Sequence, residues 1–220
     1  PLAMAETHLS LKRRVPDQQR LAWARKLVAS MEGRPPRTRP EIFAREQVYL
    51  HESPTAELKL QALRIGDLGV TAIPCEVYGI TGLKIKARSP LVPTFNVALA
   101  GGEEGYIPPP EQHQLGGYST WEARTAGLEE QAEPRILEAV IGLLEKVSGM
   151  PRREKIAPVH DAYAKTILKS TPVAYWRMSE FGGPKAVDCS GKGNHGQYED
   201  GVAFYLEGPP RAGPSAQAAL

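Results

Sequence analysis

The stretch AELKLQALRIGDLGVTAIP, residues 56–74, restricts the fold more than any other part of this chain. Leu58, Leu60 and Ala62 alternate with polar residues, which indicates a half-buried strand over residues 56–67. Residues 68–74 form a continuous apolar run of strand length, which is typical of a buried strand. Gly and Asp at positions 66–67 supply a turn between the two runs. The stretch therefore predicts a β-hairpin inside a sheet.

Helical spacing of apolar residues recurs on both sides of this hairpin. Apolar residues in helical spacing predict helices over residues 17–31 and 134–147, and weaker patterns predict helices over 41–50 and 77–88. Residues 94–100 read as another buried strand. Strands and helices in this order predict a layered α/β (or α+β) domain fragment.

The chain changes character near residue 150. Residues 151–170 are charged and read as a linker that contains a short helix. From residue 171 to 220, short aromatic and apolar segments alternate with Gly, Asn, Asp and Ser, which is typical of a partial all-β sandwich segment. We therefore expect a boundary between two domains at residues 150–170, and we expect the whole to be a piece of a longer protein.

Composition excludes some classes of function and leaves others open. A formal net charge of +2 over 220 residues is too small to indicate nucleic-acid binding, so we expect no nucleic-acid partner. The basic stretch RPPRTRP, residues 34–40, reads as a solvated loop rather than a binding patch. No apolar stretch is long enough to cross a membrane. Cys75 and Cys189 are compatible with one disulfide but do not require it.

Residues 101–118, GGEEGYIPPPEQHQLGGY, raise the question of function. Tyr106 and Tyr118 each follow a glycine, and three prolines lie between them, which argues against both a helix and a regular strand. Glu76 follows the second strand of the hairpin as Tyr106 follows strand 94–100. If these strands are neighbours, Glu76 and Tyr106 face one another and offer two oxygen ligands for a metal. The alternative is that Glu76 favours a helix N-terminus and that Tyr106 packs with its hydroxyl in water.

The run LQALRIGDLGVTAIPCEVYGITGLKIKARSPLVPTFNVALAGGEEGYIPPPEQHQLGGYST resembles the neutral/alkaline non-lysosomal ceramidase family, in particular its planctomycete-type ceramidase-like proteins. The resemblance covers roughly residues 5–148 and is specific over 58–120. It implies that residues 1–150 are the C-terminal part of a catalytic domain that hydrolyses amides with zinc. It also implies an amide or lipid-like substrate and an extracytoplasmic or cell-surface location.

Three residues of this chain match the family's site motifs. The resemblance implies that Glu76 and Tyr106 are zinc ligands and that Tyr118 contacts the scissile amide as a catalytic residue. No cofactor other than zinc is implied. The family's two histidine ligands lie earlier in the chain, and none of His8, His51, His113, His160 and His195 sits in a matching motif. The upstream part of the same protein is therefore the expected partner that supplies them.

Two positions near these residues need comment. Cys75 stands where the family has glycine before the glutamate, and we interpret it as a packed small residue rather than an extra ligand. His113 lies between the two tyrosines, and we interpret it as a solvent-exposed loop histidine. Neither is included in the predicted site.

The tail carries a second resemblance. PVAYWRMSE and AVDCSGKGNHGQYEDGVAF, within residues 172–204, resemble the opening of a concanavalin A-like, laminin-G-like sandwich. That resemblance implies a truncated module able to bind carbohydrate. It leaves open a second function, in which the chain is a non-catalytic carbohydrate-binding module, and a third, in which it is a structural or assembly component of a cell surface.

Overall fold

A computed structural model gives the fold of residues 1–153, 162–180, 183–199, 201–202, 204, 206–207 and 217–218. The chain divides into two compact units, Pro1–Arg153 and Glu154–Leu220. The division lies within the boundary region expected from the sequence.

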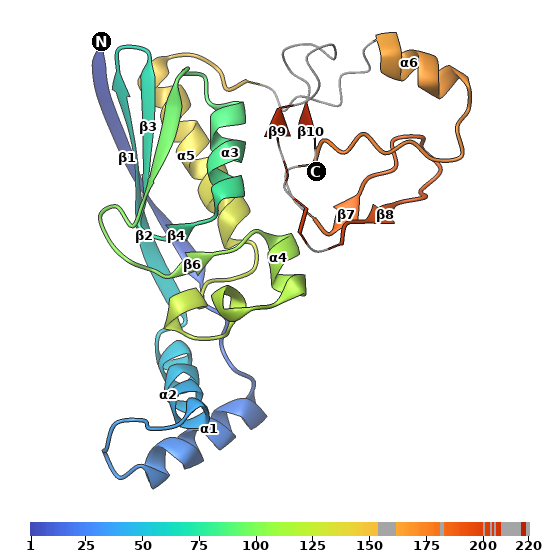
Figure 1. Cartoon of the computed structure of the whole chain (residues 1–220). Helices are drawn as coiled ribbons and strands as arrows, with labels where there is room; N and C mark the ends of the chain where they lie inside the picture. Colours follow the sequence, from blue (N-terminus) through green and yellow to red (C-terminus); the bar gives the residue numbers. More distant parts are fainter. Residues whose placement is uncertain are drawn as a thin grey trace. The chain divides into compact units, whose positions relative to one another are not determined.

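The first unit is a mixed sheet with helices (Figure 1). Its elements in chain order are β1 (Leu2–Lys12), α1 (Gln18–Ser30), α2 (Arg39–Glu52), β2 (Thr55–Ile65), β3 (Leu68–Ile73), β4 (Glu76–Val77), α3 (Gly79–Arg88), β5 (Thr94–Ala98), β6 (Tyr106–Ile107), α4 (Pro110–Leu115), the 3₁₀ helices η1 (Tyr118–Thr120) and η2 (Arg124–Ala126), and α5 (Ala132–Ser148). Helices and strands thus occur in one layered unit, as an α/β arrangement predicts.

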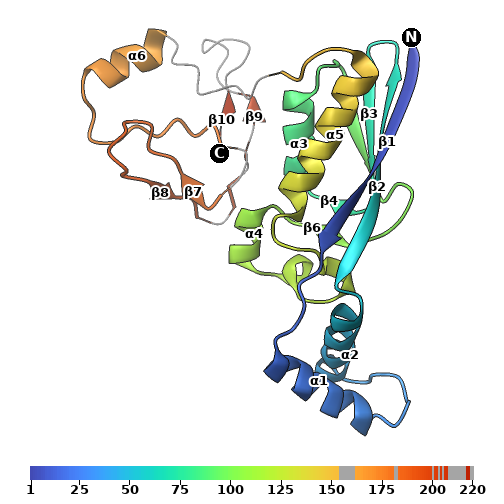
Figure 2. The ribbon, with the colours of Figure 1, turned by 180° about the vertical axis from the view of Figure 1, so that it is seen from behind.

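The main sheet has the strand order β1-β2-β3-β5. The hairpin is present as predicted, because β2 and β3 are antiparallel, with Leu63 opposite Val70 and Ile65 opposite Leu68. β3 and β5 are parallel, and α3 connects them. α5 packs against β1 and β2, and α3 packs against both α5 and β5 (Figures 1 and 2). Large buried side chains of this core include Leu58, Leu60, Ile73, Ile85, Ile136, Ile141 and Leu144.

The predicted helices are present with local differences at their ends. Asp17 caps α1 by accepting from the Arg20 amide at 2.7 Å. A capping box between Thr38 and Glu41 starts α2 inside the RPPRTRP stretch, so that stretch is not wholly a loop. α3 begins at Gly79 rather than at 77, because residues 76–77 form β4. At the end of α5, Gly149 takes a left-handed conformation with φ 70°.

Two parts of the first unit differ from the sequence-based expectation. β1 was not predicted, although it pairs with β2 along its whole length, from Leu2 opposite Ile65 to Lys12 opposite Thr55. The expectation that residues 101–118 hold neither helix nor strand was wrong. The structure has β6 there, and Pro110 occupies the first turn of the short helix α4, where proline needs no amide donor.

Among the described residues of the second unit are α6 (Ala162–Lys169) and the two-residue strands β7 (Lys185–Ala186), β8 (Gly196–Gln197), β9 (Leu206–Glu207) and β10 (Gln217–Ala218). β7 pairs with β8 and β9 with β10, both antiparallel, and Trp176 forms an antiparallel bridge with Asp188. The Asp188 carboxylate accepts from the amides of Tyr175, Ser190 and Asn194 at 2.8–2.9 Å. These three hydrogen bonds connect the two sides of the loop that contains Asp188. The larger sandwich stays a prediction.

Candidate functional site

The candidate site lies where two parallel strands end. After β3 the chain continues into β4, and after β5 it continues through residues 99–105 into β6. β4 and β6 form a second parallel pair, in which Glu76 is directly opposite Tyr106. Side chains at the carboxyl ends of neighbouring parallel strands meet at one edge of a sheet. The fold therefore brings together two residues that are thirty positions apart in the sequence.

Tyr118 completes the group that we call the phenol site, which consists of Glu76, Tyr106 and Tyr118. The Tyr118 hydroxyl donates to the Tyr106 hydroxyl at 2.9 Å, and the two rings meet edge to face with their centroids 5.2 Å apart. This hydrogen bond and, next, the neighbouring Glu76 carboxylate raise the pKa of Tyr106 above its ordinary value. The Tyr118 side chain is 61% exposed, so the phenol site is open to solvent.

The structure thus brings together the three residues that the sequence singled out, while their chemical roles stay predictions. The histidines within the described residues are elsewhere or differently placed, and His160 lies outside the described residues. His8 pairs with Glu57 at 2.6 Å, and His195 accepts from the Asp188 amide at 3.1 Å. His51 lies in the last turn of α2.

His113 is not the exposed loop histidine that we expected. It lies in α4, it is half-buried, and its Nδ1 atom is buried without a hydrogen-bond partner among the described residues. Burial first, and the positive charge of Arg14 second, lower the pKa of His113. The prolines before it hid the short helix that carries it.

Sequence reasoning missed two hydroxyl groups beside the phenol site. Tyr78 follows β4 by one residue, and its hydroxyl lies 2.5 Å from the Ser119 hydroxyl. This contact links the segment after Glu76 to the segment after Tyr118. The position of Tyr78, two residues after Glu76, could have suggested it, because alternate residues of an extended chain point in the same direction.

The loop that carries Tyr118 is held by three side chains, Arg14, Glu46 and Gln47, which we call the framework residues. Arg14 donates to the carbonyls of Thr120 and Ala126 at 2.8 and 2.5 Å. Glu46 accepts from the Arg124 guanidinium at 2.8 and 2.7 Å. Gln47 donates to the Glu122 carbonyl at 2.7 Å. These contacts fix the backbone on both sides of Trp121.

Burial and pairing compete at Glu46, which is only 5% exposed. Burial would raise the pKa of its carboxyl group, but hydrogen bonds from the Arg124 side chain and amide outweigh burial and leave the pKa below its ordinary value. Glu46 is therefore ionised at neutral pH and holds Arg124 in place.

Glycine is required at position 105, directly before Tyr106. Its φ is 74°, and a Cβ atom built there would lie 2.3 Å from the Thr125 carbonyl oxygen. The backbone of β6 therefore touches the backbone of η2. Because no side chain fits between them, Tyr106 is positioned by contact with the loop that also carries Tyr118.

Cys75 is a packed residue, in agreement with our interpretation of the sequence. It is fully buried in the core, and both Cys75 and Cys189 are free thiols. Burial, followed by the charges of Glu104 and Glu103, raises the pKa of the Cys75 thiol to about 12. At neutral pH the buried thiol is therefore almost entirely protonated.

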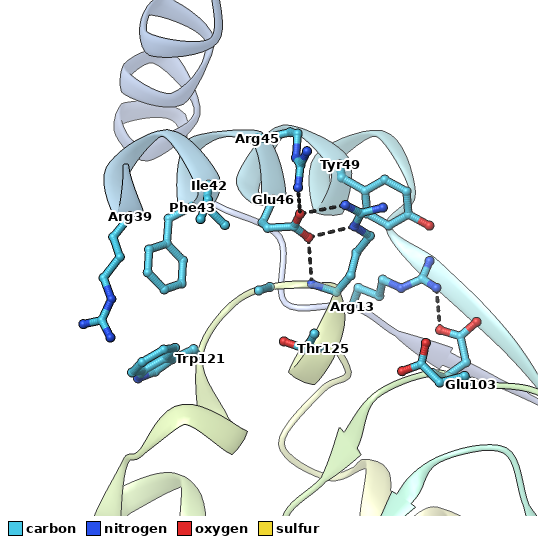
Figure 3. A pocket seen from close by; sticks show the side chains of 13 residues that line it. Arg13, Arg39, Ile42, Phe43, Arg45, Glu46, Tyr49, Glu103, Trp121 and Thr125 are labelled. Carbon is cyan, nitrogen blue, oxygen red and sulfur yellow. Dashed lines mark hydrogen bonds and ion pairs between the residues drawn. The ribbon is translucent and has the colours of Figure 1, made fainter. Parts of the chain in front are cut away.

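A cavity of about 640 Å³ lies between α2 and the segments that flank the two tyrosines (Figure 3). Its walls combine arginine, glutamate and aromatic side chains. We call it the arginine cavity, and it is lined by Arg13, Arg39, Ile42, Phe43, Arg45, Glu46, Tyr49, Glu103, Glu104, Trp121, Ala123, Arg124 and Thr125. Sequence reasoning did not find it, because its walls come from segments far apart in the chain.

Within the described ranges, no group of three or more His, Cys, Asp or Glu side chains is arranged to hold a metal. In the same part of the chain, no helix is long and apolar enough to cross a membrane. No protein-family model and no curated protein matches this chain. The geometry of the site and the motif resemblance are therefore the observations that bear on its function.

Proposed function

We propose that this chain is part of a zinc-dependent amide hydrolase, in which Glu76 and Tyr106 hold the metal and Tyr118 contacts the substrate. The observation that carries the proposal is the phenol site itself. Glu76 and Tyr106 are opposite one another on parallel strands, and Tyr118 donates to Tyr106 at 2.9 Å. A motif that only packs would not need to bring a carboxylate and two phenols, one of them exposed, to the same place.

The donor set fits two of the four positions that zinc ordinarily uses. A carboxylate oxygen and a phenol oxygen are both suitable ligands for a borderline metal ion. The other two donors would come from the part of the protein outside these 220 residues, as the resemblance implies. When bound, zinc lowers the pKa of water to about 7 and so supplies hydroxide near neutrality.

The chain's own residues have separate tasks in this proposal. Glu76 and Tyr106 would bind the metal ion and hold it in position. The raised pKa of Tyr106 keeps its phenol protonated until a cation is present. Tyr118 is exposed, and in this proposal its single hydroxyl proton, which it donates to Tyr106 in the unliganded chain, turns to the substrate carbonyl. During attack on an amide, negative charge grows on the carbonyl oxygen, and a donor fixed at that point stabilises it. Arg14, Glu46 and Gln47 keep this donor in position.

Zinc binding by the 220-residue chain is the most direct test. We expect weak binding, because two ligands leave the site incomplete, and we expect it to change the ultraviolet absorbance of Tyr106 as the phenol loses its proton. Glu76→Gln and Tyr106→Phe should abolish the change, whereas Tyr118→Phe should retain it. Tyr163→Phe is the matched control, since Tyr163 is 72% exposed and lies in the second unit.

In the full-length protein, Tyr118→Phe should lower amide turnover by about 10²–10³ with unchanged zinc content, because one oxyanion donor is lost. Tyr106→Phe should lower both turnover and zinc content. If Tyr118→Phe loses zinc while Tyr106→Phe keeps it, the two phenols have the opposite roles. If neither variant changes zinc content or turnover, the phenol site is packing and the proposal is wrong.

A further inference from the structure

We propose that the arginine cavity binds the amine half of the substrate, and that this half is an apolar amino acid with a free carboxylate. This inference rests on the proposed amide hydrolysis and narrows its substrate class to N-acylated apolar amino acids. It is carried by the charge balance of the cavity, by its aromatic wall and by its short distance along the chain to the phenol site.

Most charges of the cavity are paired with one another. Arg13 pairs with Glu104 at 2.6 Å, and Glu46 pairs with Arg124 at 2.7 Å and with Arg45 at 3.5 Å. Arg39 has no carboxylate partner among the described residues. Its guanidinium lies 5.6 Å from the ring centroid of Trp121. Within the described part of the chain, this cation of the cavity is thus free to meet an anion from outside.

An apolar surface lies beside this free guanidinium. Trp121 and Ile42 are each 42% exposed, and Phe43 meets Trp121 edge to face at 5.6 Å. In Figure 3 Arg39, Phe43 and Trp121 lie together at one side of the cavity. A ligand with a carboxylate and an apolar side chain could pair with the Arg39 guanidinium and also cover the exposed ring of Trp121. An α-amino acid carries those two groups on one carbon atom.

A negative charge elsewhere in the cavity restricts which side chain the bound amino acid can have. Glu103 has no ion pair or hydrogen bond with any residue that the structure describes, and Figure 3 shows it on the opposite side of the cavity from Arg39. Glu103 and Arg39 form no ion pair with each other. Glu103 would repel a second negative charge on the ligand, however. The cavity therefore favours an apolar amino acid over an acidic one.

The cavity and the phenol site are close because they share two segments. Glu104 lines the cavity and precedes Tyr106 by two residues, and Trp121 lines it and follows Tyr118 by three. A fully extended chain spans at most about 3.6 Å per residue, so the Cα atoms are at most about 7 and about 11 Å apart. The cavity and the phenol site are therefore neighbours, and in this proposal one N-acyl amino acid spans them.

This inference is tested with two probes. They differ only in whether the carboxylate is present. N-acetyl-L-phenylalanine and N-acetyl-L-phenylalaninamide are titrated into the 220-residue chain, and binding is followed by the nuclear magnetic resonance signal of the Trp121 indole. We expect the acid to bind about tenfold more tightly than the amide, since one charge-assisted contact is added. Added salt should reduce this preference. N-acetyl-L-aspartate should bind more weakly than N-acetyl-L-phenylalanine.

Arg39→Gln should remove the preference for the acid and leave binding of the amide unchanged. The matched control is Arg20→Gln, because Arg20 also lies over a tryptophan, Trp23, at 4.2 Å but does not line the cavity. The control should keep the preference. Circular dichroism shows whether each variant is folded, and the salt dependence of the wild-type chain provides a measurement that needs no variant.

Equal binding of acid and amide by the wild-type chain overturns the inference, as does an Arg39→Gln variant that keeps the preference. Either result leaves the zinc proposal standing, because that proposal is tested by tyrosine absorbance. A clear preference for the acid in a chain whose phenol site does not respond to zinc overturns the substrate assignment instead. The cavity would then bind a carboxylate without amide chemistry.

Discussion

The framework residues and the phenol site belong to the same corner of the first unit but differ in burial. Two of the framework side chains are buried, whereas the phenol site is open to solvent. Glu46 and Gln47 are 5% and 1% exposed, and each reaches across to the loop that carries Tyr118. Tyr118 is 61% exposed and shares a single hydrogen bond with Tyr106. Buried polar groups are costly unless paired, and the framework side chains each bond to this loop, although Arg14 Nε and Gln47 Oε1 have no partner among the described residues.

This difference in burial indicates which of these side chains can bind a ligand. A buried carboxylate whose oxygens both accept from neighbours, such as Glu46, has no free capacity for a ligand. The phenols of Tyr106 and Tyr118 have free capacity and are accessible. We therefore expect changes in the framework to lower stability, and changes in the phenol site to alter proton and metal binding with little effect on stability.

The largest effect is expected for Gly105→Ala. The new Cβ atom would lie 2.3 Å from the Thr125 carbonyl oxygen, and the residue would have to keep a φ of 74°. Left-handed strain and overpacking together should lower the free energy of unfolding by about 2–5 kcal/mol. Urea unfolding measures the loss.

Gly101→Ala is the control for this prediction. Gly101 lies in the same segment with a φ of 78°, but among the described residues no atom lies within 4 Å of the place that a Cβ atom would take there. Only the left-handed strain of roughly 1–2 kcal/mol should remain. Equal losses for the two variants would show that contact between β6 and η2 does not position Tyr106.

An intermediate effect is expected for Glu46→Gln, which weakens the contact with Arg124. At neutral pH the loss should be about 1–2 kcal/mol in the free energy of unfolding, because a charge-assisted pair is replaced by a neutral one. Arg45→Gln, which removes an exposed partner at 3.5 Å, should cost at most about 0.5 kcal/mol. A larger loss for Arg45→Gln than for Glu46→Gln would contradict the assigned framework.

The pH dependence of the same variant has a definite sign. The pKa of Glu46 is lower in the folded chain than its ordinary value of 4.5, so its ionised form stabilises the fold above pH 4.5. This stabilisation is lost as the pH falls through the folded-state pKa. The difference in unfolding free energy between the wild-type chain and Glu46→Gln should therefore shrink in acid. A difference that grows below pH 4.5 would reverse the argument.

The smallest effect on stability is expected for Tyr118→Phe, within about 0.5 kcal/mol, because the side chain is exposed. Its effect on protonation should nevertheless be clear. The Tyr118 hydrogen bond is the largest cause of the raised pKa of Tyr106, so that pKa should fall toward the ordinary value. Ultraviolet titration of the tyrosines measures it. No change in the titration would mean that the two hydroxyls are not coupled.

Local patterns in the sequence were enough for the hairpin, α1 and α5. Their apolar residues recur at short intervals, so each element can be identified from its own residues. β1 has the same alternation, with Ala3, Ala5, Leu9 and Leu11 toward the helices, but its pairing with β2 joins residues about fifty positions apart. Nothing local shows which partner such a strand will find.

Some residues of the candidate site could likewise be predicted from local sequence, and others could not. Glu76, Tyr106 and Tyr118 could be found because each lies in a recognisable motif after a strand or glycine. Arg14 contacts carbonyls more than one hundred residues away, and Arg39 lines a cavity with Trp121. Those contacts depend on how α2 packs against the loop that carries Tyr118. The spacing of residues in the sequence does not predict this packing. The Pro-rich stretch hid β6 and α4, since prolines suit the first turn of a helix as well as a loop.

The rate at which the Cys75 thiol is modified can report on opening of the structure at this site. Its thiol is fully buried directly before Glu76, and its pKa of about 12 leaves almost no thiolate at neutral pH. A thiol-specific reagent can reach it only when β4 separates from its neighbours, so the rate of modification reports how often this edge opens. Half-buried Cys189 should react sooner and marks the rate without such protection. Any ligand that binds Glu76 and Tyr106 together should slow the Cys75 reaction, whatever chemistry follows.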